Sequence, residues 1–331
     1  MKTLILKKYR YLCDYKPITM YYSLLLIIPI AAFAGLYYYK RSRKRTTTEV
    51  IVATEDLIEE EASHEEADPP KPERFLRTSH DTSKQCIRLL GGFIVKDRNG
   101  DDISGLFTPR LRLLLTMLIL STEENPDGIS GDTIVERLWS NKNKYAARNN
   151  RNVSLTKLRG IFEKIGHIEI VNQGNYWKIV FGEDVLCDYS EAITYYQAIE
   201  ANKIYDEFHL NILLDLLYSG SLLPRTDSEW LNHYKGRFSY QTIEVLTSLL
   251  NDSSITNNDF KLKTANTLLQ HDYLNEEALR VQCLLLHKSG KTKEMSSCYQ
   301  EFCTNYSNLL GIQYNKTLWE IIKPSPTAEQ Q

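Results

Sequence analysis

The stretch that decides the fold is WSNKNKYAARNNRNVSLTKLRGIFEKIGHIEIVNQGNYWKIVF, residues 139 to 181. Between Asn141 and Lys164 it carries seven cations against the single acid Glu163, with amide and hydroxyl side chains interleaved. Cations neutralise phosphates, and short amide or hydroxyl side chains can read base edges in a major groove. The second half alternates apolar and polar residues around a turn, as a hairpin does. The stretch therefore predicts a basic helix that enters a DNA groove, followed by a two-stranded wing.

The basic helix is predicted to start near Tyr145 or Ala146. Its buried stripe is expected from apolar residues at helical spacing, namely Leu155, Leu158, Phe162 and Ile165. The candidate DNA-binding residues of the helix are Lys144, Arg148, Asn149, Arg151, Asn152, Ser154, Thr156, Lys157 and Arg159. Asn152 is the candidate base reader, and the cations are expected mainly to contact phosphates.

The wing is predicted from the alternation that follows Gly166, with a turn at residues 172 to 175. Its polar tip is expected over a minor groove or the DNA backbone. The candidate contacts there are Asn172, Gln173, Asn175 and Tyr176. A basic helix can also be an ordinary solvated face, and a winged helix can bind protein, so both readings stay open at this point.

Upstream of the basic helix, residues 87 to 95 have the composition of a strand, and turn residues 97 to 101 predict a small antiparallel sheet that returns through Ile103. Thr108 followed by Pro109 is typical of a helix start, because the hydroxyl caps the first turn and proline fits there. Ser130 is expected to cap a second helix. This order of elements predicts an α+β winged helix-turn-helix domain.

The same residues resemble a known family. The strand with its Gly91-Gly92 pair, the helix from Pro109, and the later motifs Glu136-Arg137-Leu138-Trp139, Ala147-Arg148-Asn149 and Thr156-Lys157-Leu158-Arg159 resemble the OmpR/PhoB-type winged helix of AfsR-like bacterial transcriptional activators. Two positions depart from the family pattern. Arg151 lies where the family commonly has an apolar residue, and Gly160 replaces a usual arginine.

The resemblance continues downstream, so that it covers about residues 86 to 322. Three groups of residues, 218–224 with 229–231, 275–280, and Tyr299 with 310–312, look like the bacterial transcriptional activation domain that follows the winged helix in that family. That domain is similar to tetratricopeptide repeats, and the resemblance implies a surface for a protein or for a second copy of the chain. A purely structural bundle is the alternative.

The second domain is predicted to be all-α from apolar periodicity. The expected helices are 189–201, 208–218, 227–250, 259–271, 275–288, 292–309 and 314–322. Charge separates the two domains as well. Residues 86 to 182 carry 14 Lys and Arg against 10 Asp and Glu, whereas residues 183 to 331 carry 12 against 20. The acidic half is not expected to contact phosphates.

No enzymatic site is predicted, and the chain is expected to have neither a cofactor nor a metal. Gly290-Lys291-Thr292 ends like a phosphate-binding loop, but Leu285 stands where the earlier glycine of that motif belongs. The seven histidines show no paired metal-ligand spacing, and no serine lies in a nucleophile elbow. The six cysteines form no CxxC pair, so we expect reduced thiols.

Residues 18 to 39 are predicted to form a transmembrane helix. There is no charged side chain between Lys16 and Lys40, and the run would span about 30 Å at about 1.5 Å per residue. A cleaved secretion signal ending near Ala32-Phe33-Ala34 is the competing interpretation. Basic residues flank the run on both sides, so charge alone does not orient it, although the denser cluster after it favours a cytoplasmic carboxyl side.

The predicted organisation is a short segment at 1–17, the transmembrane helix at 18–39, a basic then acidic linker at 40–84, the winged helix at 85–183, the helical domain at 184–323 and a tail at 324–331. The leading hypothesis is a DNA-binding transcription regulator in the inner membrane, with its carboxyl-terminal body in the cytoplasm. The predicted partners are double-stranded DNA, a second copy of the chain, and a membrane sensor. The family resemblance also implies RNA polymerase as a partner, through the loop at 140–144. The alternative is a membrane-anchored adaptor that binds proteins and not DNA.

Overall fold

The computed structural model describes residues 83–201 and 206–323. Backbone contacts divide the chain into two units, Met1–Lys71 and Pro72–Gln331, and every described residue belongs to the second. The predicted transmembrane helix, nearly all of the linker and the tail lie outside the described residues. Within the described ranges, no helix has both the length and the apolar character needed to cross a bilayer.

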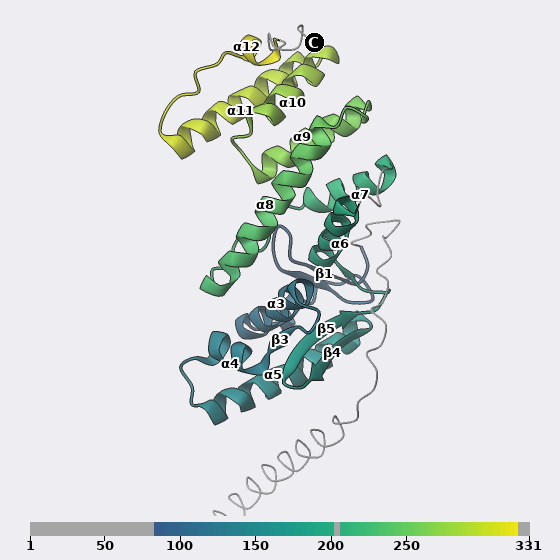
Figure 1. Cartoon of the computed structure of the whole chain (residues 1–331), viewed down its shortest axis with the longest axis vertical. Coiled ribbons are helices and arrows are strands. Elements are labelled where there is room, and N and C mark those ends of the chain that lie inside the picture. The colour runs from purple at the N-terminus through teal and green to yellow at the C-terminus, as the bar shows by residue number, and fades with distance from the viewer. Residues whose placement is uncertain (1–82, 202–205, 324–331) are drawn as a thin grey trace, which may run out of the picture. The chain divides into compact units, whose positions relative to one another are not determined.

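The first part of the described chain is a winged helix (Figure 1). Its elements are β1 (Cys86–Arg88), β2 (Ile94–Lys96), a 3-10 turn (Ser104–Leu106), α3 (Pro109–Glu124), β3 (Ile129–Ser130), α4 (Gly131–Trp139), α5 (Lys144–Ile165), β4 (Ile168–Gln173) and β5 (Tyr176–Phe181). The order confirms the predicted helices and hairpin of this domain.

Each helix of the winged domain starts at a residue that can satisfy its free backbone N–H groups. The Thr108 hydroxyl accepts a hydrogen bond from the Leu111 N–H at the start of α3, and Pro109 follows it. The Ser130 hydroxyl accepts from the Thr133 N–H in the same way at α4. At α5 the cap is the Asn143 side chain, which accepts from the Ala146 N–H at 2.8 Å. A capping side chain contributes about 1 kcal/mol to a helix, which is why these local signals locate its first turn.

The first predicted strand is two strands. The chain reverses after β1 at Gly91, whose φ is +74°, and returns as β2, which pairs with β1 in antiparallel register. The prediction of one strand over residues 87 to 95 was wrong, because composition alone does not reveal a reversal within an apolar run. The expected return through Ile103 is present, since the Ile103 N–H donates to the Val95 carbonyl.

The wing is a tight hairpin. β4 and β5 pair in register from Ile168 opposite Phe181 to Gln173 opposite Tyr176, which leaves Gly174 and Asn175 as the two turn residues. Both have positive φ, 52° and 71°, as a type I′ turn requires. β3 pairs with the other edge of β5, so the sheet order is β3-β5-β4.

The remaining elements form a helical body. After β6 (Leu186–Cys187) come α6 (Asp188–Glu200), α7 (Glu207–Leu217), α8 (Glu229–Asn251), α9 (Asn258–His271), α10 (Glu276–Lys288), α11 (Thr292–Leu310) and α12 (Leu318–Ile322). Successive helices from α8 to α11 pack against one another, as expected of a repeat-like stack. The last helix begins at Leu318 and not at Tyr314, whose ring packs against Phe302 at a centroid distance of 5.0 Å.

The winged helix and the helical body share one hydrophobic core, which runs from Ile87 to Ala278. Two backbone hydrogen bonds join the end of β1 to the loop before α8: the Leu223 N–H donates to the Leu89 carbonyl, and the Gly91 N–H donates to the Ser221 carbonyl. β6 pairs with β1 in parallel. These long-range pairings bind the two parts of the described chain directly.

Asp188 lies at the centre of this junction. Its buried carboxylate accepts hydrogen bonds from the backbone N–H groups of Leu89 at 2.7 Å and Leu90 at 2.9 Å. Burial raises the pKa of Asp188 to about 6, while the N–H groups and the charge of Arg88 act in the opposite direction. The first residue of α6 therefore fixes the end of the first strand.

Candidate nucleic-acid interface

Helix α5 presents a cationic face opposite its buried stripe. Its 22 residues include six Lys and Arg against one acid. The buried residues are Ala147, Arg151, Leu155, Leu158, Phe162 and Ile165, which confirms the predicted apolar stripe. Six of the predicted DNA contacts on this helix are exposed: Lys144, Arg148, Asn149, Thr156, Lys157 and Arg159. They flank the buried stripe and cover the side opposite it, and the rigid helix fixes the spacing between them.

Two of the exposed cations carry uncompensated charge. Among the residues that the structure describes, no carboxylate forms an ion pair with Lys144 or Lys157. A lysine of this kind loses little when it meets a phosphate, because it does not first have to leave another acid. Lys144 and Lys157 are the strongest candidates for phosphate contacts on this face.

Arg148 and Arg159, the other two predicted DNA contacts among the exposed cations, have local partners. Arg148 approaches the Asp132 carboxylate of α4 at 3.4 Å, and both side chains are about half exposed or more. Such an exposed pair contributes at most about 1 kcal/mol, so it orients Arg148 more than it neutralises it. The guanidinium of Arg159 donates to the Ile170 carbonyl of β4 at 3.2 Å. Because that acceptor is uncharged, Arg159 keeps its full positive charge at the foot of the wing.

Arg151 does not belong to the exposed face. The residue is only 8% exposed, and its guanidinium lies over the Trp177 ring of β5, 5.2 Å from the ring centroid. The prediction that Arg151 contacts DNA directly is corrected by this burial. The physical reason is its position on the apolar stripe, four residues before Leu155, where the helix turns it toward β5.

The Arg151 side chain instead joins α5 to the wing. A cation–π contact of this kind is worth about 2 kcal/mol when it is shielded from water. The guanidinium also donates through Nε to the Asn152 side-chain carbonyl at 3.1 Å. A Cβ placed on Gly131 would lie 2.2 Å from Arg151 Nη1, so only glycine leaves room for the guanidinium there. Sequence reasoning had no signal for this contact, because Arg151 and Trp177 are far apart in the chain.

Asn152 and Ser154, the remaining predicted residues of α5, are half-buried. The Asn152 carbonyl oxygen is engaged by Arg151, which fixes the orientation of its amide. Ser154 lies at the edge of the exposed face. Asn149 and Thr156, by contrast, are exposed.

The predicted wing residues gather at the tip of the hairpin. Asn172, Gln173, Asn175 and Tyr176 are all exposed, and the Tyr176 ring keeps 45% of its surface accessible. The tip carries amides and one phenol and no acid, so it can approach a phosphate backbone without repulsion. The structure thus leaves twelve of the thirteen predicted residues exposed or half-buried on α5 and the hairpin, and buries Arg151.

Nothing in the described ranges indicates a metal centre, since no group of three or more His, Cys, Asp or Glu side chains is arranged to hold an ion. None of the five described cysteines forms a disulfide bond. The Cys187 thiol is fully buried, and burial raises its pKa well above the ordinary value. Such a thiol is a packing group, not a nucleophile.

At the level of sequence, this chain shows little likeness to known proteins. No family model matches the sequence, and no curated protein matches it. A solved structure, Mycobacterium tuberculosis EmbR in complex with low affinity phosphopeptide, is similar with a TM-score of 0.45 and 16% sequence identity. The match covers 72% of this chain and 64% of that chain, so this chain spans less than two thirds of that protein.

Proposed function

We propose that this protein is a transcription regulator that binds double-stranded DNA through α5 and the β4–β5 wing. The single observation that supports the proposal is the exposed cationic face of α5, which lies opposite an apolar stripe and beside a polar hairpin tip. A helix of this width fits the major groove, where base edges differ in their donors and acceptors. Residues 183 to 331, by contrast, carry 12 Lys and Arg against 20 Asp and Glu.

The exposed residues divide into two roles. Lys144, Arg148, Lys157 and Arg159 would contact phosphates and supply most of the affinity, which falls as salt rises. Asn149, Asn152 and Thr156 carry short polar groups that can pair with base edges and so supply sequence preference. The wing tip would contact the backbone beside the groove. Arg151 takes part only indirectly, since it holds the wing against α5.

The direct test is binding of duplex DNA to the full chain. Fluorescence anisotropy with random-sequence duplex at 50 to 200 mM salt should show affinity that falls steeply with salt, and binding of genomic fragments should then reveal preferred sites. The double variant Lys157→Ala with Arg159→Ala should weaken binding and flatten the salt dependence. A matched double variant on the helical body, Lys288→Ala with Lys293→Ala, should leave both unchanged. Absence of binding even at the lowest salt would favour an adaptor that binds proteins through the same surface.

A contact with RNA polymerase is proposed for the loop between α4 and α5. Residues 140 to 144 are all exposed, and Lys142 and Lys144 give the loop a positive charge. Alanine substitutions at Asn141 and Lys142 should then lower transcription from a bound promoter and leave DNA affinity unchanged. Equal losses of both would assign the loop to DNA binding instead.

Attachment to the inner membrane through residues 18 to 39 is also a proposal, and it rests on the uncharged run in the sequence. Reporter fusions after Tyr39 and after Gln331 test it together with the cytoplasmic placement of the body. A carboxyl terminus that reports from the outer side of the membrane would exclude a DNA-binding role. Recovery of the intact chain without membranes would exclude the anchor and leave the DNA proposal standing.

A further inference from the structure

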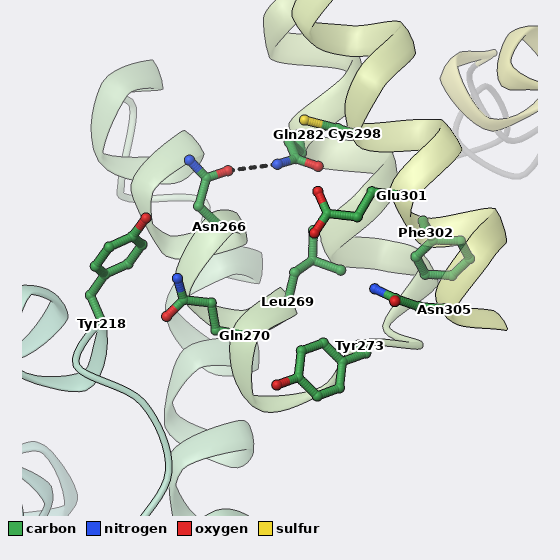
Figure 2. A pocket seen from close by; sticks show the side chains of 10 residues that line it. All are labelled: Tyr218, Asn266, Leu269, Gln270, Tyr273, Gln282, Cys298, Glu301, Phe302 and Asn305. Carbon is green, nitrogen blue, oxygen red and sulfur yellow. Dashed lines mark hydrogen bonds between the residues drawn. The ribbon is translucent and has the colours of Figure 1, made fainter. Parts of the chain in front are cut away.

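A groove lies in the helical body between α9 and α11, with α10 packed against both (Figure 2). Its volume is about 310 Å³. The residues that line it are Tyr218, Asn266, Leu269, Gln270, Tyr273, Gln282, Cys298, Glu301, Phe302 and Asn305. They come from four helices or their ends (Figure 2).

The two walls of the groove follow the same spacing. One wall is formed by residues 266, 269, 270 and 273, and the other by residues 298, 301, 302 and 305. Residues 266, 269 and 270 on α9, and all four residues on α11, have the offsets of a single helix face, the face that a stacked helix normally turns toward a neighbour. Tyr273 follows α9, which ends at His271. Together the two walls carry amides, a tyrosine and a carboxylate among their apolar residues. Neither face is fully covered by a neighbouring helix, and polar side chains on both line the groove.

The hydrogen bonding inside the groove is incomplete. The Gln282 amide donates to the Asn266 carbonyl oxygen at 2.8 Å, while the Gln282 side-chain oxygen is buried without a hydrogen-bond partner among the described residues. Gln282 itself is only 9% exposed. A buried acceptor without a partner destabilises the folded state. The side-chain amides of Gln270 and Asn305 likewise have no hydrogen-bond partner in the described ranges.

The chemistry of these groups matches an extended peptide. A side-chain amide is a donor and an acceptor at once, as is each peptide unit, and an extended segment leaves its own N–H and C=O groups unpaired. Seven residues of helix cover about 10 Å, which corresponds to about three residues of extended chain. The half-exposed rings of Tyr218 and Tyr273 add flat apolar surface along one wall.

The groove also carries a charge preference. Glu301 is the one charged side chain among the ten described residues that line it. A lysine or arginine of the bound segment would be attracted to this carboxylate, and an aspartate, glutamate or phosphorylated residue would be repelled. We propose that the groove binds an extended, neutral or basic segment of a partner protein through its main chain, with a cationic side chain beside Glu301.

The position of α7 supports a preformed site. The His271 Nε2 atom lies 2.9 Å from the Leu217 carbonyl, which ties the end of α7 to the end of α9. This contact places Tyr218 beside Gln270. Burial lowers the pKa of His271, so the ring is neutral at physiological pH and adds no positive charge to that wall. The site does not involve α5 and stands whether or not the chain binds DNA.

The test is selection from an array of random, immobilised heptapeptides by the labelled full chain. Bound sequences should be enriched in Lys and Arg at one position and depleted in Asp, Glu and phosphoserine by about two- to fivefold, the effect of one exposed ion pair. Methylation of the central backbone nitrogens of a bound peptide should abolish binding. The variant Glu301→Lys should reverse the preference toward acidic peptides, whereas Glu244→Lys on the exposed side of α8 should retain the original one.

Two further variants distinguish the loss of peptide contacts from a loss of folding. Gln270→Ala and Asn305→Ala should each weaken every bound peptide by about fivefold, the loss expected for one hydrogen bond, while Gln300→Ala on α11 outside the groove should have no effect. Thermal unfolding at an unchanged midpoint confirms that each variant is folded. No peptide above background, equal binding of methylated peptides, or the same preference in Glu301→Lys would each overturn the proposal.

Discussion

Substitutions of Lys157 and Arg151 on α5 are expected to affect the salt dependence of DNA binding differently. Lys157 is exposed and has no acidic partner in the described chain, whereas Arg151 is buried over Trp177. If the exposed face binds phosphates, Lys157→Ala should change the salt dependence of DNA binding. Arg151→Met should weaken binding without changing the salt dependence, because its charge never meets a phosphate. Methionine keeps much of the apolar stem, so that packing is largely preserved.

The size of the effect follows from the number of exposed cations. Four of the predicted cationic contacts remain once Arg151 is set aside, namely Lys144, Arg148, Lys157 and Arg159. At about −0.9 per phosphate, the slope of log affinity against log salt is about −3.6, which is about a 150-fold loss between 50 and 200 mM salt. Lys157→Ala should reduce this to about −2.7, or about a 40-fold loss over the same range. Arg151→Met should keep the slope near −3.6 and lower affinity by up to about thirtyfold, if the ~2 kcal/mol of a shielded cation–π contact is lost.

Fluorescence anisotropy of the full chain on one labelled duplex, repeated at five salt concentrations, measures both quantities. Lys293→Ala on α11 serves as a control for the general effect of one lost charge. Urea unfolding of each variant establishes how much native protein is present during the titration. Circular dichroism confirms that Arg151→Met retains its helices.

Either of two results would refute this division of roles. A slope that stays at the wild-type value in Lys157→Ala would remove Lys157 from the DNA contact. A flatter slope in Arg151→Met would mean that the buried guanidinium leaves Trp177 when DNA binds, and the exposed face would then be larger than the structure shows.

Three further predictions concern stability. Gly160→Ala should raise the free energy of unfolding in urea by about 0.5–1 kcal/mol, because a Cβ there meets open space on a helix, and Gly236→Ala on α8 should match it. The pKa of Asp188 in the folded protein is raised to about 6 from 3.8. The free energy of unfolding should therefore be highest below pH 3.8 and should fall, by up to about 3 kcal/mol, as the pH rises through 6. Asp188→Asn should abolish this pH dependence in urea unfolding from pH 4 to 8, and an identical pH profile would contradict the raised pKa. Gly91→Ala should destabilise the fold by about 1–3 kcal/mol and lower the unfolding midpoint accordingly, since its Cβ would lie 2.1 Å from the Ser219 carbonyl oxygen. An unchanged midpoint would show that the backbone at Ser219 can move to accommodate the Cβ.

Local signals in the sequence predict most of the helices. The predicted helix at 259–271 is observed as Asn258–His271, and the predicted segment 292–309 as Thr292–Leu310. Capping residues and apolar spacing act within one or two turns, so they can be recognised without the rest of the chain. The parallel pairing of β6 with β1 could not be predicted in this way, because the two strands are about 100 residues apart and each is too short to have a clear pattern.

The exposure of the candidate DNA contacts was predictable from the sequence with one exception, Arg151, whose place in the helical periodicity already indicated burial. Arg151 lies four residues after Ala147 and four before Leu155, on the line of buried residues. A charged residue on such a line is expected to be exposed unless a partner covers it, and the partner, Trp177, becomes visible only in three dimensions. The groove beside Gln282 was not predicted at all, since its two walls come from separate helices whose facing is set by packing.

The shared core constrains how two copies of the chain could bind neighbouring DNA sites. β1, β6 and the loop at Leu222 join the winged helix to the helical body, so the described chain has no hinge between these two parts. The winged helix is the part proposed to bind DNA, and the helical body is the part expected to contact a second copy of the chain. A pair of such molecules could engage two sites cooperatively only when these sites face the same side of the double helix. Inserting about five base pairs between the sites should then abolish cooperativity, and inserting about ten, one full turn, should restore it.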